Sequence, residues 1–185
     1  MPQTLYLRAK TIRNMKKLLY LIRHASAEDG GNTPMFRDFD RDLTSTGIIE
    51  SARMGKFLAE TGIKFDSIVS SAAERAKSTA KIFAEQLEYD ADDIVLDEGL
   101  YGGGARTYLS AVNLLDESLN NVAIFGHNPD VTFFSEYLTR ADIGGAMEPA
   151  GVIILEFDAK WADVSSKMGK FLGYHSPKTI NPQID

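Results

Sequence analysis

Short apolar runs alternate along this chain with longer segments of helical periodicity, and this alternation constrains the fold more than any other feature. Six short runs are typical of strands: residues 18–22, 67–70, 94–96, 122–125, 152–157 and 170–174. Between them, apolar residues recur at helical spacing over residues 44–61, 73–87, 108–115 and 131–138. Strands that alternate with helices predict a mostly parallel sheet covered on both faces. The expected fold class is therefore α/β, a three-layer α/β/α sandwich with a mostly parallel central sheet.

The first predicted helix has a recognisable start. Thr44 or Ser45 is expected to cap it, because a hydroxyl oxygen accepts a hydrogen bond from a free backbone N–H at a helix start. One face of this helix contains Ile48, Ala52, Gly55 and Ala59. This pattern predicts an amphipathic helix that packs against the sheet.

Length and the basic start of the chain determine the expected domain organisation. At 185 residues the chain is long enough for one domain with a full core, and no repeat divides it. We expect a single domain over residues 15–185, preceded by an N-terminal extension over residues 1–14. The extension has basic residues and no acidic one, as a transit peptide does. An extended or misassigned start is the interpretation we favour, because Met15 and two lysines open directly onto the first apolar run.

Composition argues against several classes of function. The formal net charge of −6 argues against nucleic acid or an anionic membrane as the main partner. The chain has no cysteine, which excludes disulfides, thiolate zinc sites and a cysteine nucleophile, and is typical of a cytoplasmic protein. No apolar run approaches the roughly 18 residues that indicate a membrane span. The sequence predicts no particular oligomeric state.

Polar residues follow three of the predicted strands. Arg23 and His24 come after the first strand, Arg75 after the second and His127 after the fourth. Because the carboxyl ends of parallel strands meet at one edge of a sheet, we expect these side chains to gather there. A lone histidine is more often structural than catalytic. The shared position of two of the three histidines favours a joint functional role.

Two arginines and two histidines at one edge predict an anion site. Guanidinium groups bind phosphate oxygens through paired, charge-assisted hydrogen bonds. A metal site is the competing interpretation, but adjacent arginines repel a cation, and a cation would need more carboxylate or histidine ligands. We therefore expect no metal and no cofactor. The glycine run 102–104 lacks the lysine of a phosphate-binding loop and predicts a flexible turn.

Four segments resemble the signature of the histidine phosphatase superfamily, which includes the phosphoglycerate mutases. Residues 21–25 (Leu-Ile-Arg-His-Ala) resemble its strand followed by Arg-His-Gly, and residues 43–47 (Leu-Thr-Ser-Thr-Gly) resemble its Leu-Thr-x-x-Gly helix start. Residues 70–80 resemble its Ser-x-x-x-Arg-Ala-x-x-Thr-Ala segment, and residues 126–129 (Gly-His-Asn-Pro) resemble its second-histidine motif. The short length and the compact region around Tyr101 resemble the SixA-like phosphohistidine phosphatase branch.

This resemblance implies the histidine phosphatase (phosphoglycerate mutase-like) fold and a reaction through a covalent intermediate. Neutral His24 would attack phosphorus in line and become phosphorylated, and water would then hydrolyse the phosphohistidine. Nearby arginines are expected to keep His24 neutral, since like charge disfavours imidazolium. Arg23, Arg75 and His127 would hold the phosphate oxygens while charge shifts in the transition state. Ser26, beside the nucleophile, is a further candidate for binding phosphate.

The sequence departs from the family pattern at two positions. Ala25 replaces the glycine after the histidine, a change that adds only a methyl group. Many relatives place their general acid, a glutamate, directly before a Leu-Tyr pair, where this chain has Gly99. Glu98, one residue earlier, is therefore the candidate general acid. The displaced glutamate favours phosphohistidine as substrate, because imidazole is a better leaving group than an alkoxide and needs less acid help.

The leading hypothesis is a metal-independent phosphatase that hydrolyses phosphohistidine in a phosphorylated protein. The first alternative is a small-molecule phosphomonoesterase of the same superfamily, which acts on a small phosphate ester. The second alternative is a catalytically silent phosphate-binding module. The intact pair of His24 and His127 argues against the silent module.

Overall fold

The computed structural model describes residues 16–30 and 37–180, so the predicted extension over residues 1–14 lies outside the described residues. Its strands are β1 (Lys17–Arg23), β2 (Ser67–Ser71), β3 (Val95–Asp97), β4 (Asn121–Gly126), β5 (Val152–Phe157) and β6 (Lys170–His175). Its α-helices are α1 (Ser45–Glu60), α2 (Glu74–Gln86), α3 (Gly104–Asn113), α4 (Asp130–Leu138) and the short α5 (Pro177–Ile180). No helix within these described ranges has the length and apolar character needed to cross a membrane.

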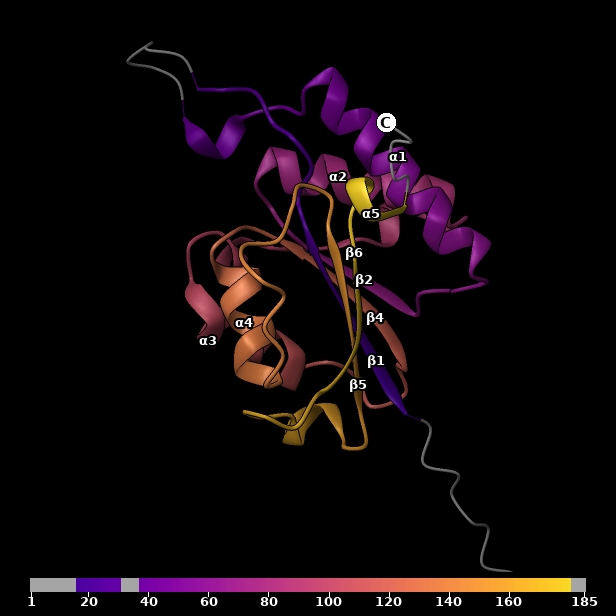
Figure 1. The fold of residues 1–185 in the computed structure, drawn as a ribbon, viewed down its shortest axis with the longest axis vertical. Coiled ribbons are helices and arrows are strands. Elements are labelled where there is room, and N and C mark those ends of the chain that lie inside the picture. Colours follow the sequence, from indigo (N-terminus) through magenta and orange to yellow (C-terminus); the bar gives the residue numbers. More distant parts are fainter. Residues whose placement is uncertain (1–15, 31–36, 181–185) are drawn as a thin grey trace, which may run out of the picture.

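One sheet contains all six of these strands, in the order β3-β2-β4-β1-β5-β6 (Figure 1). β4 pairs in parallel with β1 and β2, and β2 pairs in parallel with β3. β5 runs antiparallel to its neighbours β1 and β6. β1 therefore lies inside the sheet, which explains why its apolar run is continuous rather than alternating. The prediction of a mostly parallel sheet is confirmed.

Helices cover both faces of the sheet, because successive side chains of a strand point to opposite sides. In β1, Leu19 and Leu21 pack in the core shared with α3 and α4. Tyr20 and Ile22, on the other face, pack in the core shared with α1 and α2. Figure 1 shows these two helix layers on either side of the sheet. The predicted three-layer α/β/α sandwich is confirmed.

Helix α1 starts as predicted and buries Gly55 of the predicted face, but the centre of its buried face is shifted away from Ile48. Thr44 is its N-cap, and the Thr44 hydroxyl accepts the N–H of Gly47 at 3.0 Å. Gly47 lies so close to the Ser26 carbonyl that a Cβ atom there would collide with the oxygen. This contact turns Gly47 and Met54 inward and leaves Ile48 51% exposed. The prediction that Ile48 faces the sheet is therefore wrong.

Helix α3 begins at Gly104, earlier than the predicted start at Tyr108. Gly102 and Gly104 have φ angles of 75° and 69°, a region that favours glycine because it has no Cβ atom. The glycine run is therefore a tight turn that leads directly into the helix. Low helix propensity made these glycines a poor signal for a helix start.

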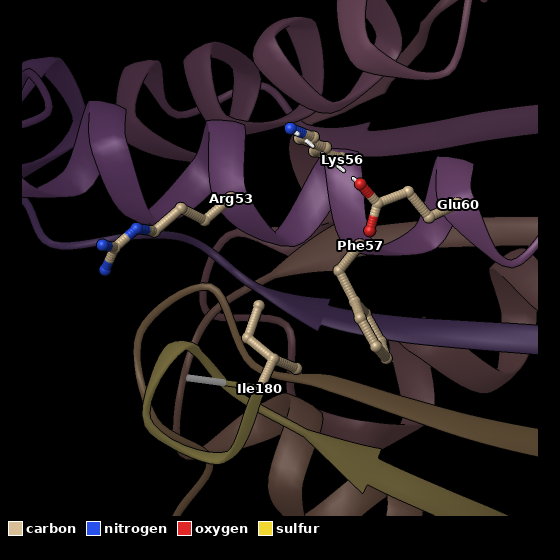
Figure 2. A pocket seen from close by; sticks show the side chains of 5 residues that line it. All are labelled: Arg53, Lys56, Phe57, Glu60 and Ile180. Carbon is tan, nitrogen blue, oxygen red and sulfur yellow. Dashed lines mark ion pairs between the residues drawn. The ribbon is translucent and has the colours of Figure 1, made fainter. Parts of the chain in front are cut away.

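A pocket of about 300 Å³ lies between α1 and α5 (Figure 2). Phe57 of α1 and Ile180 of α5 face each other across it, whereas Arg53 extends away along the surface. The ring of Phe57 also packs against His175, the third histidine, with ring centroids 5.0 Å apart. His175 belongs to β6, two strands from β1, and makes this packing contact instead of joining the other two histidines.

Candidate active site

Three polar segments meet at the carboxyl edge of the sheet, as their positions after the strands predict. Arg23 at the end of β1 is the register partner of Gly126 at the end of β4. The His24 N–H donates to the Gly126 carbonyl at 2.9 Å, and the rings of His24 and His127 lie 5.1 Å apart between centroids. Arg75, in the first turn of α2, donates from Nε to His24 Nε2 at 3.3 Å. The fold thus brings these distant residues together.

The hydrogen bonds of His24 define its tautomer. Its Nδ1 lies 2.7 Å from the Ala25 carbonyl oxygen, which only accepts hydrogen bonds, so Nδ1 carries the ring proton. Nε2 therefore holds a lone pair, which is what a nucleophile requires. In this structure that lone pair accepts the Arg75 Nε–H. The reactive nitrogen consequently faces the arginine that is predicted to bind phosphate.

Side chains from α1 and α2 hold the loop that carries His24. The Ala25 N–H donates to Thr79 Oγ1 at 3.0 Å, and the Thr79 hydroxyl donates to the Arg75 carbonyl at 2.7 Å. The Glu50 carboxylate accepts the Ser26 N–H at 2.9 Å and the Ser26 hydroxyl at 3.0 Å. Ser26, a candidate for binding phosphate, therefore directs its hydroxyl proton to Glu50 in this structure.

His127 is buried and oriented through both its ring and its backbone. The Ser71 hydroxyl lies 2.8 Å from His127 Nε2 and already accepts the Ala73 N–H, so its own proton is available to Nε2. When the Ser71 hydroxyl donates to Nε2, the ring proton of His127 lies on Nδ1. The Tyr108 hydroxyl accepts the His127 backbone N–H at 3.1 Å, in the space that a side chain at Gly126 would occupy. Glycine at 126 is therefore required for this support.

Two buried nitrogen atoms at this edge lack a hydrogen-bond partner, Arg23 Nε and His127 Nδ1. They are the two such side-chain atoms found across residues 16–30 and 37–180. Arg23 is anchored through Nη1, which donates to the Met147 carbonyl at 2.6 Å, and Asn128 donates to the same carbonyl at 2.9 Å. An unpaired buried donor costs about 1–3 kcal/mol. An oxyanion bound beside Arg23 and His127 would satisfy both donors.

Asp38 engages the guanidinium of Arg75 from the 3-10 helix η1 (Asp38–Asp40). Arg75 donates from Nη1 to the Asp38 carbonyl at 2.6 Å and from Nη2 to the Asp38 carboxylate at 2.9 Å. That carboxylate also accepts the Tyr101 hydroxyl at 2.7 Å and Arg41 Nη1 at 2.9 Å. The Tyr101 hydrogen bond first, and then the two arginines, hold the pKa of Asp38 well below its usual range. The ionised carboxylate of Asp38 therefore forms a salt bridge with Arg75.

Both histidines of the site are neutral at physiological pH. Burial, and to a smaller extent the charges of Arg75 and Arg23, lower the pKa of His24 to about 4. The hydrogen bond to Ala25 acts in the opposite direction. Burial also lowers the pKa of His127 to about 3, and the neighbouring His24 and Arg75 contribute in the same direction. The expected effect of the arginines on His24 is present, although burial is the larger cause.

We expect two of the three histidine ring signals to stay constant in an NMR titration from about pH 8 to about pH 5. His24→Gln and His127→Gln variants assign these signals. The unfolded chain takes up protons on both rings near pH 6.5, whereas the folded protein does so only near pH 4 and below. The free energy of unfolding should therefore fall as pH is lowered from about 6.5 to about 4. A signal of either residue that titrates near pH 6.5 would contradict this account.

Asp38 and Tyr101 belong to the site but were not predicted from the sequence. The run of alternating charges over residues 37–42 is a sequence signal for Asp38, but it does not indicate a contact with Arg75. Glu98, the candidate general acid, is exposed in the 3-10 helix η3 (Glu98–Leu100), directly before Tyr101. Its side chain makes no hydrogen bond or ion pair with the described residues. Among those residues, no group of three His, Asp or Glu side chains is arranged to hold a metal ion.

The geometry describes an α/β protein with two neutral histidines and two arginines at one sheet edge, which suits an oxyanion. Residues 19–101 match the family model of the histidine phosphatase superfamily, branch 1. A 2,3-bisphosphoglycerate-dependent phosphoglycerate mutase of Bartonella henselae is 37% identical over 92 residues, which cover 48% of this chain and 45% of the mutase. The sequence match therefore spans less than half of that mutase.

Two solved SixA structures share the fold over nearly their whole length. The putative phosphohistidine phosphatase SixA of Agrobacterium tumefaciens is 25% identical, with a TM-score of 0.73, and the match covers 87% of this chain and 98% of that protein. The protein histidine phosphatase SixA complexed with tungstate is 19% identical, with a TM-score of 0.76 over 89% of this chain and 99% of that one. The chain thus has the histidine phosphatase fold, matches the superfamily over residues 19–101 and resembles the SixA structures. These similarities support a phosphatase activity.

Proposed function

We propose that this protein is a phosphatase that hydrolyses phosphohistidine through a covalent phosphohistidine intermediate on His24. The observation that carries the proposal is the pair of unpaired donors, Arg23 Nε and His127 Nδ1, beside the lone pair of His24. Buried donors that lack a partner next to a nucleophile are positioned to receive phosphoryl oxygens. The tungstate complex of a SixA protein supports this proposal, because tungstate is a tetrahedral oxyanion like phosphate.

In the first step, the lone pair of His24 Nε2 attacks phosphorus and the P–N bond of the substrate breaks. The electron pair of that bond leaves with the substrate nitrogen. The His24 ring becomes an imidazolium, which keeps its Nδ1 proton on the Ala25 carbonyl. Arg23, Arg75 and His127 hold the phosphoryl oxygens while their charge shifts.

In the second step, water attacks the phosphorus of phosphorylated His24 from the side that the leaving group has vacated. A P–O bond forms, the P–N bond breaks, and its electron pair returns to Nε2. Both protons of the water stay on the product, which leaves as dihydrogen phosphate. His24 is again neutral, with its proton on Nδ1. Neither step uses a metal ion or a cofactor in this proposal.

The ionisation of Asp38 favours phosphohistidine over an alkyl phosphate ester. Its carboxylate is held ionised by three donors, so it has no proton for a leaving oxygen. When the second ring nitrogen of the phosphohistidine carries a proton, the imidazole leaves as a neutral group and needs no acid.

We propose a phosphorylated protein as the substrate. The absence of cysteine is consistent with a reducing compartment, and we place the reaction in the cytoplasm.

A small phosphate ester is the second candidate substrate, which the similarity to a phosphoglycerate mutase favours. The test is a side-by-side assay of the full chain on a histidine-phosphorylated protein and on a panel of sugar phosphates and nucleotides, with and without EDTA. We expect the highest kcat/KM on the phosphoprotein and the same rates in EDTA. Faster turnover of a small ester would assign the second candidate. Phosphate binding without any turnover would indicate a silent module, and a metal-restored loss in EDTA would contradict metal independence.

The Glu98→Gln variant should keep near-normal kcat/KM on phosphohistidine, because the exposed Glu98 carboxylate has no partner within the described site. A leaving imidazole that carries its own proton does not need this group. The measurement is kcat/KM on phosphohistidine protein, with Glu88→Gln as a control on a second exposed carboxylate. A decrease of about a hundredfold, the low end for a lost acid–base group, would show that Glu98 is the general acid after all.

A further inference from the structure

Two aromatic side chains, Phe39 and Tyr101, stand beside the phosphate-binding residues, and we call them the aromatic wall. The ring of Tyr101 packs edge-to-face on His127, with ring centroids 5.5 Å apart and an interplanar angle of 81°. Phe39 packs on Tyr101 in the same manner, at 5.1 Å and 90°. Tyr101 nevertheless keeps 36% of its surface exposed. The wall therefore borders the site and remains accessible to a ligand.

Polar contacts hold the aromatic wall in place relative to the phosphate-binding residues. The Tyr101 hydroxyl donates to the Asp38 carboxylate at 2.7 Å, and Asp38 is the residue before Phe39. The guanidinium of Arg75 lies 5.8 Å from the centroid of the Tyr101 ring, as in a cation–π contact. Tyr101 therefore contacts Arg75, His127 and Asp38 together. A ring with these three contacts is ordered before any substrate binds.

The wall lies where the group attached to phosphorus must be accommodated. In-line attack by His24 Nε2 places the leaving group on the far side of phosphorus, away from the ring of His24 and toward the solvent. Arg75 and His127 are the side chains expected to flank the phosphoryl group, and the partly exposed ring of Tyr101 contacts both of them. Aromatic rings pair favourably with a second ring at centroid separations of about 4.5–7 Å. The rings of Phe39 and Tyr101 offer such a partner to a planar leaving group.

We propose that the aromatic wall of Phe39 and Tyr101 binds the ring of the leaving group and selects substrates whose phosphoryl group is attached to a planar aromatic ring. The imidazole of phosphohistidine is such a ring, so this inference rests on the proposed function and names a determinant of its specificity. The wall contributes in the transition state as well as in the ground state, because the departing ring stays in contact with it. A leaving group without a ring gains nothing from this contact.

The test compares two small substrates that share a P–N bond and differ in the ring, phosphoimidazole and phosphoramidate. The measured quantity is the ratio of their kcat/KM values in the wild type and in Phe39→Leu, Tyr101→Leu and Tyr101→Phe variants. We expect the ratio to fall about three- to tenfold in both leucine variants, the effect expected of one lost aromatic pair. Tyr101→Phe keeps the ring and should preserve the ratio. Phe133→Leu, which removes an exposed ring on α4, is the matched control and should also preserve it.

Failure of this inference and failure of the proposed function give different results. A wild-type protein that hydrolyses neither these P–N substrates nor a histidine-phosphorylated protein would overturn the proposed function. Normal turnover with the same ratio in the wild type, Phe39→Leu and Tyr101→Leu would overturn the aromatic wall alone. Phe39 makes no polar contact in this site, so its leucine variant tests the wall even where Tyr101→Leu disturbs Asp38. Circular dichroism and binding of inorganic phosphate verify that each variant is folded.

Discussion

Replacement of His24 by alanine is expected to abolish phosphatase turnover while the protein stays folded. The variant loses the Nε2 lone pair, and none of the neighbouring groups can replace it, because the second histidine directs its own Nε2 to the Ser71 hydroxyl. We expect kcat to fall by at least about 10⁴-fold, as for other enzymes that lose their nucleophile. The measurement is single-turnover release of phosphate from phosphohistidine protein.

The binding of inorganic phosphate provides the internal control for His24→Ala. Arg23, Arg75 and His127 remain, so the variant should still bind phosphate in a calorimetric titration. His175→Ala removes a histidine that packs on Phe57 outside the site and should keep the wild-type rate. Full activity of His24→Ala would contradict the covalent mechanism, and its loss together with loss of phosphate binding would indicate a folding defect instead.

Substitutions at the ion pair of Arg75 and Asp38 should have opposite effects. Loss of the Arg75 guanidinium should lower kcat/KM, whereas loss of the Asp38 charge should strengthen phosphate binding. Arg75→Ala removes the guanidinium beside His24 Nε2, and we expect kcat/KM to fall about 10²- to 10³-fold, as for other groups that stabilise transition-state charge. Arg75→Lys should recover only part of this loss, because a single ammonium lacks the planar fork of donors. Stopped-flow kinetics on the phosphoprotein measure both variants.

Asp38→Asn should strengthen the binding of inorganic phosphate, because the Asp38 carboxylate competes with phosphate for Arg75. About half of the Asp38 side chain is exposed, so we expect a modest gain of about three- to fivefold, equivalent to about 1 kcal/mol or less. Calorimetric titration with phosphate measures the change. Weaker binding in Asp38→Asn would show that the carboxylate positions Arg75 for phosphate and does not compete with it.

The overall fold could be predicted because its signals are local. The apolar run of β1 reflects a strand buried on both faces, and the helices after β2 and β4 keep a regular apolar spacing. The inward face of α1 could not be predicted, because it depends on the contact between Gly47 and the Ser26 carbonyl, which only the folded chain brings together. The early start of α3 could not be predicted either, because Gly102 and Gly104 have low helix propensity and adopt positive φ angles where the turn leads into the helix.

The gathering of the site residues could be predicted in part. His24, Arg75 and His127 follow parallel strands, and this position alone brings them to one edge. Asp38 and Tyr101 come from a loop and a turn without sheet register, so their contacts with Arg75 depend on tertiary structure alone. The tautomers of the two histidines and the unpaired donors beside them also follow from hydrogen bonds that no sequence pattern indicates.

The most direct test of the central claim is to trap the covalent intermediate. Protein mixed with a substrate that carries radiolabelled phosphate is quenched in alkali within milliseconds, digested, and analysed for labelled peptides. We predict a label on the peptide that contains His24, stable in alkali and lost in acid, as expected of a phosphorylated imidazole, and absent from His24→Ala. Wild-type turnover with no label on protein, or with the label on another residue, would contradict the proposal that His24 is the nucleophile.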